Sequence, residues 1–148
     1  MVLLHDEIID KKKRWLYRYR NNQLKIARLQ NKLETLENRI ISIKSPNYSG
    51  MPRGGTPITL DDLLSDKEDI KKRIKRLSSK GNAIKREIQE AIDTLEYPKQ
   101  AEVLEYWFID GYNVDQINEI LSYSNTYIYR LYSRALKNID IPGIPFNS

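Results

Sequence analysis

The sequence predicts an all-α protein in which a long antiparallel helical hairpin, or coiled coil, is followed by a small helix-turn-helix domain. Apolar residues recur at alternating intervals of three and four over most of residues 8–95, which is the spacing of a helical seam. A loop rich in Pro and Gly divides this pattern into two stretches of similar length. After residue 97, three short helical segments separated by turn residues replace the long seam.

The two seams lie on either side of the loop at residues 45–57. The first seam consists of Ile8, Lys12, Trp15, Tyr19, Asn22, Ile26, Leu29, Leu33, Leu36, Ile40 and Ile43. The second seam consists of Leu63, Lys67, Ile70, Ile74, Leu77, Gly81, Ile84, Ile88, Ala91 and Leu95. Their similar lengths favour an antiparallel hairpin spanning residues 1–97, with seams that pair within one chain or between chains. We expect a homo-oligomer held by this coiled coil.

The whole chain has a net charge of +5, and its basic residues are concentrated in the first part. Residues 1–97 contain 21 Lys and Arg against 14 Asp and Glu, whereas residues 98–148 contain 4 against 6. The basic runs Lys11–Arg14 and Lys71–Arg76 are typical of solvated helix faces, with phosphate contact as the alternative. Arg53 either belongs to a simple hairpin turn, or it enters a minor groove or clamps a phosphate. The second set of candidate DNA contacts is therefore Arg53, Lys71, Lys72 and Arg73.

Residues 98–140 are predicted to form the helix-turn-helix domain, and residues 141–148 a tail. The predicted helices are Lys99–Asp110, Val114–Leu121 and Asn125–Asn138. Asn113 and Ser124 stand where N-caps are needed, and the three residues before Asn125 are enough for a tight turn. The side chains expected in the core are Val103, Leu104, Trp107, Phe108, Ile117, Ile120 and Leu121. A short helix, a tight turn and a longer helix make the helix-turn-helix arrangement.

The last predicted helix has one apolar face and one basic face. At 100° per residue, the core side holds Ile128, Leu131, Tyr132, Ala135 and Ile139. The candidate DNA-binding residues on and beside the opposite face are Asn125, Thr126, Tyr127, Tyr129, Arg130, Ser133, Arg134 and Lys137. Arg pairs in fork fashion with guanine, short hydroxyl residues fit near bases, and Tyr and Lys reach phosphates. A solvated basic helix end, favoured by the helix dipole, is the alternative.

Several classes of function are not expected from this composition. The chain has no Cys and a single His, His5, which excludes thiolate metal sites, disulfides and a histidine metal site. Paired carboxylates in a cleft, an activated nucleophile and a phosphate-binding glycine loop are not recognisable, so we expect no enzyme activity and no cofactor. The start MVLLHDEIID lacks the apolar run of a signal peptide. We therefore expect a cytoplasmic protein without a membrane partner.

Residues 97–139 resemble the region-4 module of bacterial sigma factors. The matching elements are Pro98, Val103-Leu104, Phe108-Ile109-Asp110-Gly111, Ile117, Ile120, Leu121, Ser124, Ile128 and Arg134-Ala135-Leu136-Lys137. Ser122 stands where that module usually has the Gly that opens the turn. The resemblance implies double-stranded DNA as the partner.

The chain from about residue 5 to 140 also resembles the ArpU/RinA-like transcriptional regulators of phages that infect low-GC Gram-positive bacteria. The motifs are Tyr48-Ser49-Gly50-Met51-Pro52-Arg53-Gly54-Gly55 and Ala91-Ile92-Asp93-Thr94-Leu95-Glu96-Tyr97-Pro98. This resemblance implies a regulator of phage or prophage genes, such as an activator of late genes, in the cytoplasm of the bacterial host.

Two further functions stay open from the sequence. A small terminase subunit, which binds phage DNA for packaging, also joins a helix-turn-helix to a helical hairpin. A helical scaffold without a nucleic-acid role is the other possibility, and a gel-shift assay with phage genome fragments would separate it from both DNA-binding functions. For the regulator, the net negative charge of residues 98–148 raises host RNA polymerase as an additional partner.

Overall fold

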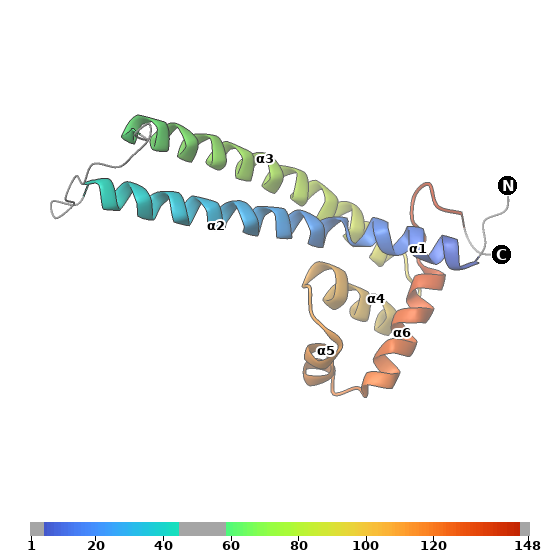
Figure 1. Cartoon of the computed structure of the whole chain (residues 1–148). Coiled ribbons are helices and arrows are strands. Elements are labelled where there is room, and N and C mark those ends of the chain that lie inside the picture. The colour runs from blue at the N-terminus through green and yellow to red at the C-terminus, as the bar shows by residue number, and fades with distance from the viewer. Residues whose placement is uncertain (1–4, 45–58, 146–148) are drawn as a thin grey trace. The chain divides into compact units, whose positions relative to one another are not determined.

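The computed structural model describes residues 5–44 and 59–145, all of whose regular elements are helical. The helices are α1 (His5–Leu16), α2 (Arg18–Lys44), α3 (Leu60–Asp93), α4 (Pro98–Leu104), a π-helical turn η1 (Glu105–Ile109), α5 (Val114–Leu121) and α6 (Asn125–Asn138) (Figure 1). The all-α prediction is confirmed. The loop motif at residues 45–57, with Arg53, lies outside the described residues.

The chain divides into two compact units, and the helices α2 and α3 contribute to both. Unit 1 comprises Met1–Asn21 and Gly81–Ser148, and unit 2 comprises Asn22–Lys80. The boundary expected between residues 97 and 98 does not coincide with this division. The helices α4, η1 and α6 share a buried core with α1 and the end of α3, and α5 packs against α4 and α6 in an adjoining cluster that contains Ile117.

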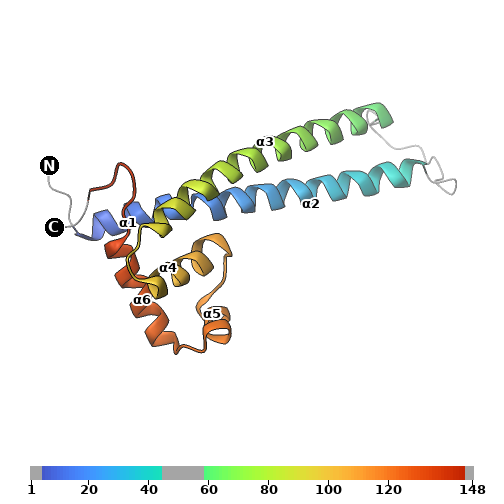
Figure 2. The same ribbon diagram turned by 180° about the vertical axis from the view of Figure 1, so that it is seen from behind.

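Unit 2 is the antiparallel hairpin that the two seams predict. Leu36 and Ile40 of α2 pack with Leu63 of α3 near one end. Near the other end, the Asn22 side-chain amide donates a 3.0 Å hydrogen bond to the Leu77 carbonyl oxygen. Residues early in α2 thus meet residues late in this part of α3, and Figures 1 and 2 show the two helices side by side. The seams pair within one chain.

Asn22 is a polar residue on a buried seam, and its hydrogen bond explains its tolerance there. Its Oδ1 atom is buried and has no hydrogen-bond partner among the described residues. A buried, half-satisfied amide costs stability, but it favours registers that bring a backbone carbonyl to its Nδ2 atom, as the Leu77 carbonyl does here. Lys67, a second polar seam residue, lies 3.7 Å from Glu37 across the hairpin.

Unit 1 has a core to which α1, α3, α4, η1 and α6 all contribute. The buried cluster consists of Leu16, Ile84, Ile88, Ala91, Ile92, Leu104, Phe108, Ala135, Leu136, Ile139 and Ile141. The seam register therefore continues from unit 2 into unit 1, where Ile84, Ile88 and Ala91 pack against the C-terminal helices rather than only against the first seam. This core joins α4 and α6 to α1 and to the end of α3.

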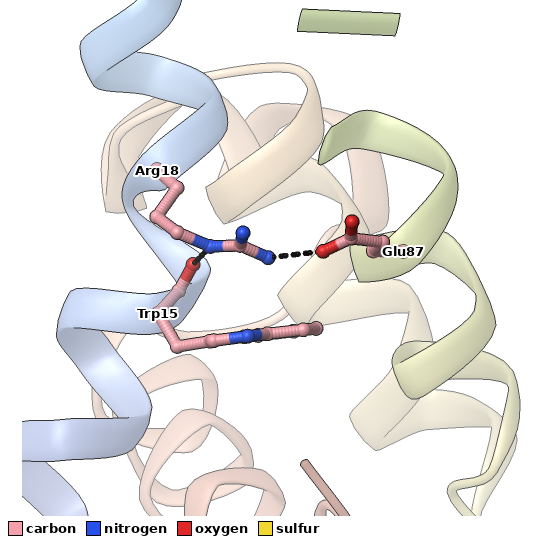
Figure 3. A network of polar contacts seen from close by, with 3 residues as sticks. All are labelled: Trp15, Arg18 and Glu87. Carbon is pink, nitrogen blue, oxygen red and sulfur yellow. Dashed lines mark hydrogen bonds and ion pairs between the residues drawn. The ribbon is translucent and has the colours of Figure 1, made fainter. Parts of the chain in front are cut away.

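The first predicted helix is interrupted once, at Tyr17, between α1 and α2. Backbone hydrogen bonds of 2.9 Å from Tyr17 N to Lys13 O and from Asn21 N to Tyr17 O continue across the interruption. The Arg18 side chain reinforces it: Nε donates to the Trp15 carbonyl at 3.0 Å, and Nη2 pairs with Glu87 Oε2 at 2.8 Å (Figure 3). The guanidinium also lies 4.5 Å from the centre of the Trp15 ring. One side chain thus links α2 to α1 and α3.

Candidate nucleic-acid interface

The turn between α5 and α6 is built from local polar contacts. Asn113 caps α5 in a reciprocal capping box, with 2.9 Å hydrogen bonds from Gln116 N to Asn113 Oδ1 and from Asn113 N to Gln116 Oε1. Ser124 caps α6, and its hydroxyl oxygen accepts from Tyr127 N at 3.1 Å. Both expected N-caps are confirmed. Asn118 donates its side-chain N–H to the Tyr123 carbonyl and so closes the turn from the α5 side.

Ser122 ends α5 in the left-handed conformation, with φ 58° and ψ 32°. A non-glycine residue in this region is strained, because its Cβ approaches the following carbonyl oxygen. The sigma region-4 module that this segment resembles usually has a Gly at this position. The backbone nevertheless makes the turn, so the side chain at 122 affects stability rather than the path of the chain.

We expect Ser122→Gly to stabilise the protein by roughly 0.5–1 kcal/mol, because it removes the strain of a positive φ. The matched control is Ser133→Gly, the same change at an exposed position inside α6, which should destabilise the protein by about 0.5 kcal/mol. Urea unfolding of both variants measures the difference. A Ser122→Gly variant that is less stable than the native chain would contradict the expected strain.

The side chains on the inner face of α6 pack against the rest of unit 1. Ile128, Leu131, Ala135, Leu136 and Ile139 are all buried. The half-buried Tyr132 stacks on Trp107 with ring centres 4.2 Å apart and lies 6.0 Å from Phe108. Burial first, and contact with Tyr17 second, raise the pKa of its phenol. The predicted core side of α6 is confirmed, and its rotation about its own axis is therefore fixed.

The C-terminal end of α6 is fixed by Lys12 of α1. Its ammonium donates to the Leu136 carbonyl at 2.9 Å and to the Lys137 carbonyl at 3.2 Å, and the residue is only 1 % exposed. The last carbonyls of a helix have no intrahelical partner and carry partial negative charge, so a buried cation there is well placed. The reading of Lys11–Arg14 as a solvated or phosphate-binding run is therefore wrong for Lys12. Burial lowers its pKa, and Asp140 partly opposes that effect.

The outward face of α6 is polar, basic and open. Five of the predicted DNA-binding residues lie exposed on this face and show no ion pair or side-chain hydrogen bond with residues 5–44 or 59–145: Thr126, Arg130, Ser133, Arg134 and Lys137. Tyr129 borders the face, is 51 % exposed and touches the edge of Trp107 at 6.0 Å between ring centres. Such a face leaves two guanidinium groups free for an anionic partner.

The remaining predicted contacts of α6 are engaged in the fold. Asn125 Nδ2 donates to Asp115 Oδ1 at 3.0 Å and so ties the start of α6 to α5. Tyr127 is half-buried, with its ring 5.1 Å from that of Tyr123.

Ile120, which the sequence assigns to the core, is instead 48 % exposed on α5. At 100° per residue, Ile120 lies about 60° around α5 from the fully buried Ile117, so it stands at the margin of the buried face.

The second set of predicted DNA contacts is only partly described. Arg53 lies outside the described residues, while Lys71, Lys72 and Arg73 are exposed on α3 within unit 2. Lys12 is the structural cation that sequence reasoning missed. Its signal was its place on the first seam, because a Lys at a seam position needs a buried partner.

Two general properties of the described residues bear on the class of protein. No group of three or more His, Asp or Glu side chains within residues 5–44 and 59–145 is arranged to hold a metal ion. None of the helices in these ranges combines the length and apolar character needed to cross a bilayer.

The fold and the site define an all-α protein with a helical hairpin and a helix-turn-helix arrangement whose second helix presents a free basic face. Residues 42–140 match the model of the family described as protein of unknown function (DUF1492), and the chain belongs to that family. No curated protein and no solved structure matches the chain. The family description assigns no activity, so the likeness to sigma region 4 and to the ArpU/RinA-like regulators stays a hypothesis.

Proposed function

We propose that the protein is a sequence-specific DNA-binding regulator of transcription that places the outward face of α6 in a major groove. The observation that carries this proposal is the combination of a packed inner face with Arg130 and Arg134 on the outer face, neither of which forms an ion pair within the part of the chain that the structure describes. A helix in this position fits the major groove, which is about 12 Å wide. The likeness to the ArpU/RinA-like regulators narrows the proposal to a phage or prophage regulator, such as an activator of late genes.

Each residue of this face has a role that follows from its place. Arg130 lies near the middle of the face and is best placed to reach a guanine edge in fork fashion. Ser133 and Thr126 are short, so they allow the helix backbone to approach the bases. Lys137 lies in the last turn of α6 and is better placed for a phosphate. Lys12 takes part indirectly, as a positioning residue that holds the end of α6.

The test is selection of duplexes from a random-sequence pool by the full chain. Repeated rounds of binding and amplification should enrich one motif, because base-edge contacts distinguish sequences by about 1–3 kcal/mol per position. Failure to enrich any motif, with the protein shown to be folded by circular dichroism, would contradict sequence-specific binding. Fusion of the enriched motif to a reporter promoter then gives the sign of regulation.

The oligomeric state separates this function from packaging. Helix-turn-helix regulators commonly bind paired half-sites as dimers, so we expect a dimer or tetramer in light scattering at micromolar concentration. A ring of about eight or more chains would instead favour a small terminase subunit. A monomer that still binds the selected duplex would contradict the expected homo-oligomer but would not contradict DNA binding by α6.

A further inference from the structure

A groove between α2 and α3 in unit 2 is lined almost entirely by cations. Its volume is about 460 Å³. The lining residues are Lys25, Arg28, Leu29, Lys32, Arg73, Arg76, Leu77 and Lys80. Six of these eight side chains are positively charged, and no acid lines the groove.

The sequence spacing explains why these cations share one face. Lys25, Arg28 and Lys32 each come directly before a seam residue of α2. Arg73, Arg76 and Lys80 do the same on α3. In an antiparallel pair, the positions that precede the seam on both helices lie on the same side of the hairpin. Seen from one end of the hairpin, the two chains turn in opposite senses and their seams face each other, so both preceding positions fall on one side. The intervals of three and four then align each set along its helix.

Within residues 5–44 and 59–145, none of these six cations forms an ion pair. The ion pairs of unit 2 that the structure describes involve only Lys67 and Glu37, which do not line this groove. Each set of three extends over eight residues, which are seven steps of 1.5 Å, or about 10 Å of helix. Six like charges within such a short length repel one another, and the repulsion is relieved when an anionic chain lies between them.

We propose that this groove binds the phosphate backbone of a nucleic acid duplex without regard to sequence. One DNA strand carries a phosphate about every 3.4 Å along the axis, so about three phosphates match the 10 Å length of the cationic lining. The site is on the hairpin and does not involve α6. It therefore adds to the proposed function and does not depend on it.

The lining favours a nucleic acid over an acidic protein helix. A helix that docks in a groove is anchored by apolar side chains in apolar pockets. Here the apolar residues are Leu29, which is 5 % exposed, and the half-buried Leu77, and the other apolar surface belongs to the aliphatic stems of the Lys and Arg side chains. The adjoining groove of about 850 Å³ shares Arg28, Lys32 and Arg73 but also contains Asp66 and Asp69. Those carboxylates would repel phosphates and mark the end of the binding site.

The experiment compares two triple variants of the full chain with equal changes in net charge. The groove variant carries Arg28→Gln, Arg73→Gln and Arg76→Gln, all at exposed positions. The control variant carries Arg39→Gln, Lys44→Gln and Lys75→Gln, which are exposed on the same hairpin but do not line the groove. Fluorescence anisotropy with a duplex of arbitrary sequence, over a salt series, gives affinity and salt slope. Circular dichroism confirms folding.

We expect the groove variant to bind at least tenfold more weakly at low salt, with a salt slope smaller by about 2–3. The control should lose no more than about threefold. Equal losses in the two variants would overturn the site, because only the total charge would then matter. Tighter binding of polyglutamate than of the duplex to the native chain, lost only in the groove variant, would also overturn it in favour of an acidic protein.

The two proposals fail separately. If pool selection enriches no motif but the groove variant still loses binding to an arbitrary duplex, sequence-specific reading by α6 is wrong and the backbone site stands. If a motif is enriched and the groove and control variants lose affinity equally, the reading helix stands and the backbone site is wrong.

Discussion

Arg130→Ala should weaken binding to the selected duplex by roughly five- to 150-fold, which corresponds to a loss of about 1–3 kcal/mol. The reason is that Arg130 lies at the centre of the outward face of α6, without a protein partner among the described residues. Its loss should change the affinity for a scrambled duplex much less. Binding of both duplexes over a salt series measures the difference.

Lys137→Ala is the matched control for Arg130→Ala. Lys137 is exposed in the last turn of α6, so its loss should weaken all duplexes nearly alike and reduce the salt slope by about one. Both variants should fold normally, because neither side chain is buried. If Arg130→Ala weakens the selected and scrambled duplexes equally, Arg130 contacts only phosphate and the reading face is assigned wrongly.

Lys12→Met should destabilise the protein by about 2 kcal/mol and lower its Tm by roughly 5–8 °C. Methionine keeps most of the buried volume but has no N–H group for the carbonyls of Leu136 and Lys137. These carbonyls would then lie near the core without a donor. Thermal unfolding measures the change, and Lys11→Met serves as the control, because Lys11 is exposed. Equal shifts in the two variants would contradict the anchoring role of Lys12.

The pH dependence of this contribution has a definite sign. Burial lowers the pKa of Lys12 below its ordinary value of 10.5, so near that pH the unfolded chain binds more protons than the folded chain. Stability contributed by this group should therefore rise as pH increases from the folded-state pKa toward 10.5. A neutral amine still carries two N–H groups for the two carbonyls. Lys12→Met should lack this rise, and urea unfolding over an alkaline pH series tests it.

The helices and the inner face of α6 could be predicted from the sequence because they depend on local periodicity. The seam spacing gave the hairpin, and Asn113 and Ser124 marked the starts of α5 and α6 correctly. The wheel of α6 separated Ile128 and Leu131 from Arg130 and Arg134. These features are decided within one or two turns of the chain, where residue spacing carries most of the information.

Features that depend on distant contacts could not be predicted in this way. The π-helical turn η1 replaces the end of the expected helix Lys99–Asp110, and its Phe108 packs edge-on to Tyr17 at 5.0 Å between ring centres. Lys12 was counted in a basic run, since its partners are carbonyls of residues more than 120 positions away. The cationic groove could be recognised only when α2 and α3 were aligned, because each of its cations taken alone resembles an ordinary surface charge.

The most direct measurement of the central claim uses a single reactive thiol on α6. The chain contains no Cys, so Ser133→Cys gives one attachment point for a chelated-iron reagent that cleaves nearby DNA. With the selected duplex, we predict cleavage confined to the enriched motif. Glu90→Cys, at an exposed position of α3 in unit 1 on the side away from the buried Ile88, is the control and should not cleave within the motif. Motif cleavage from position 90 but not from position 133, in variants that bind normally, would contradict DNA reading by α6.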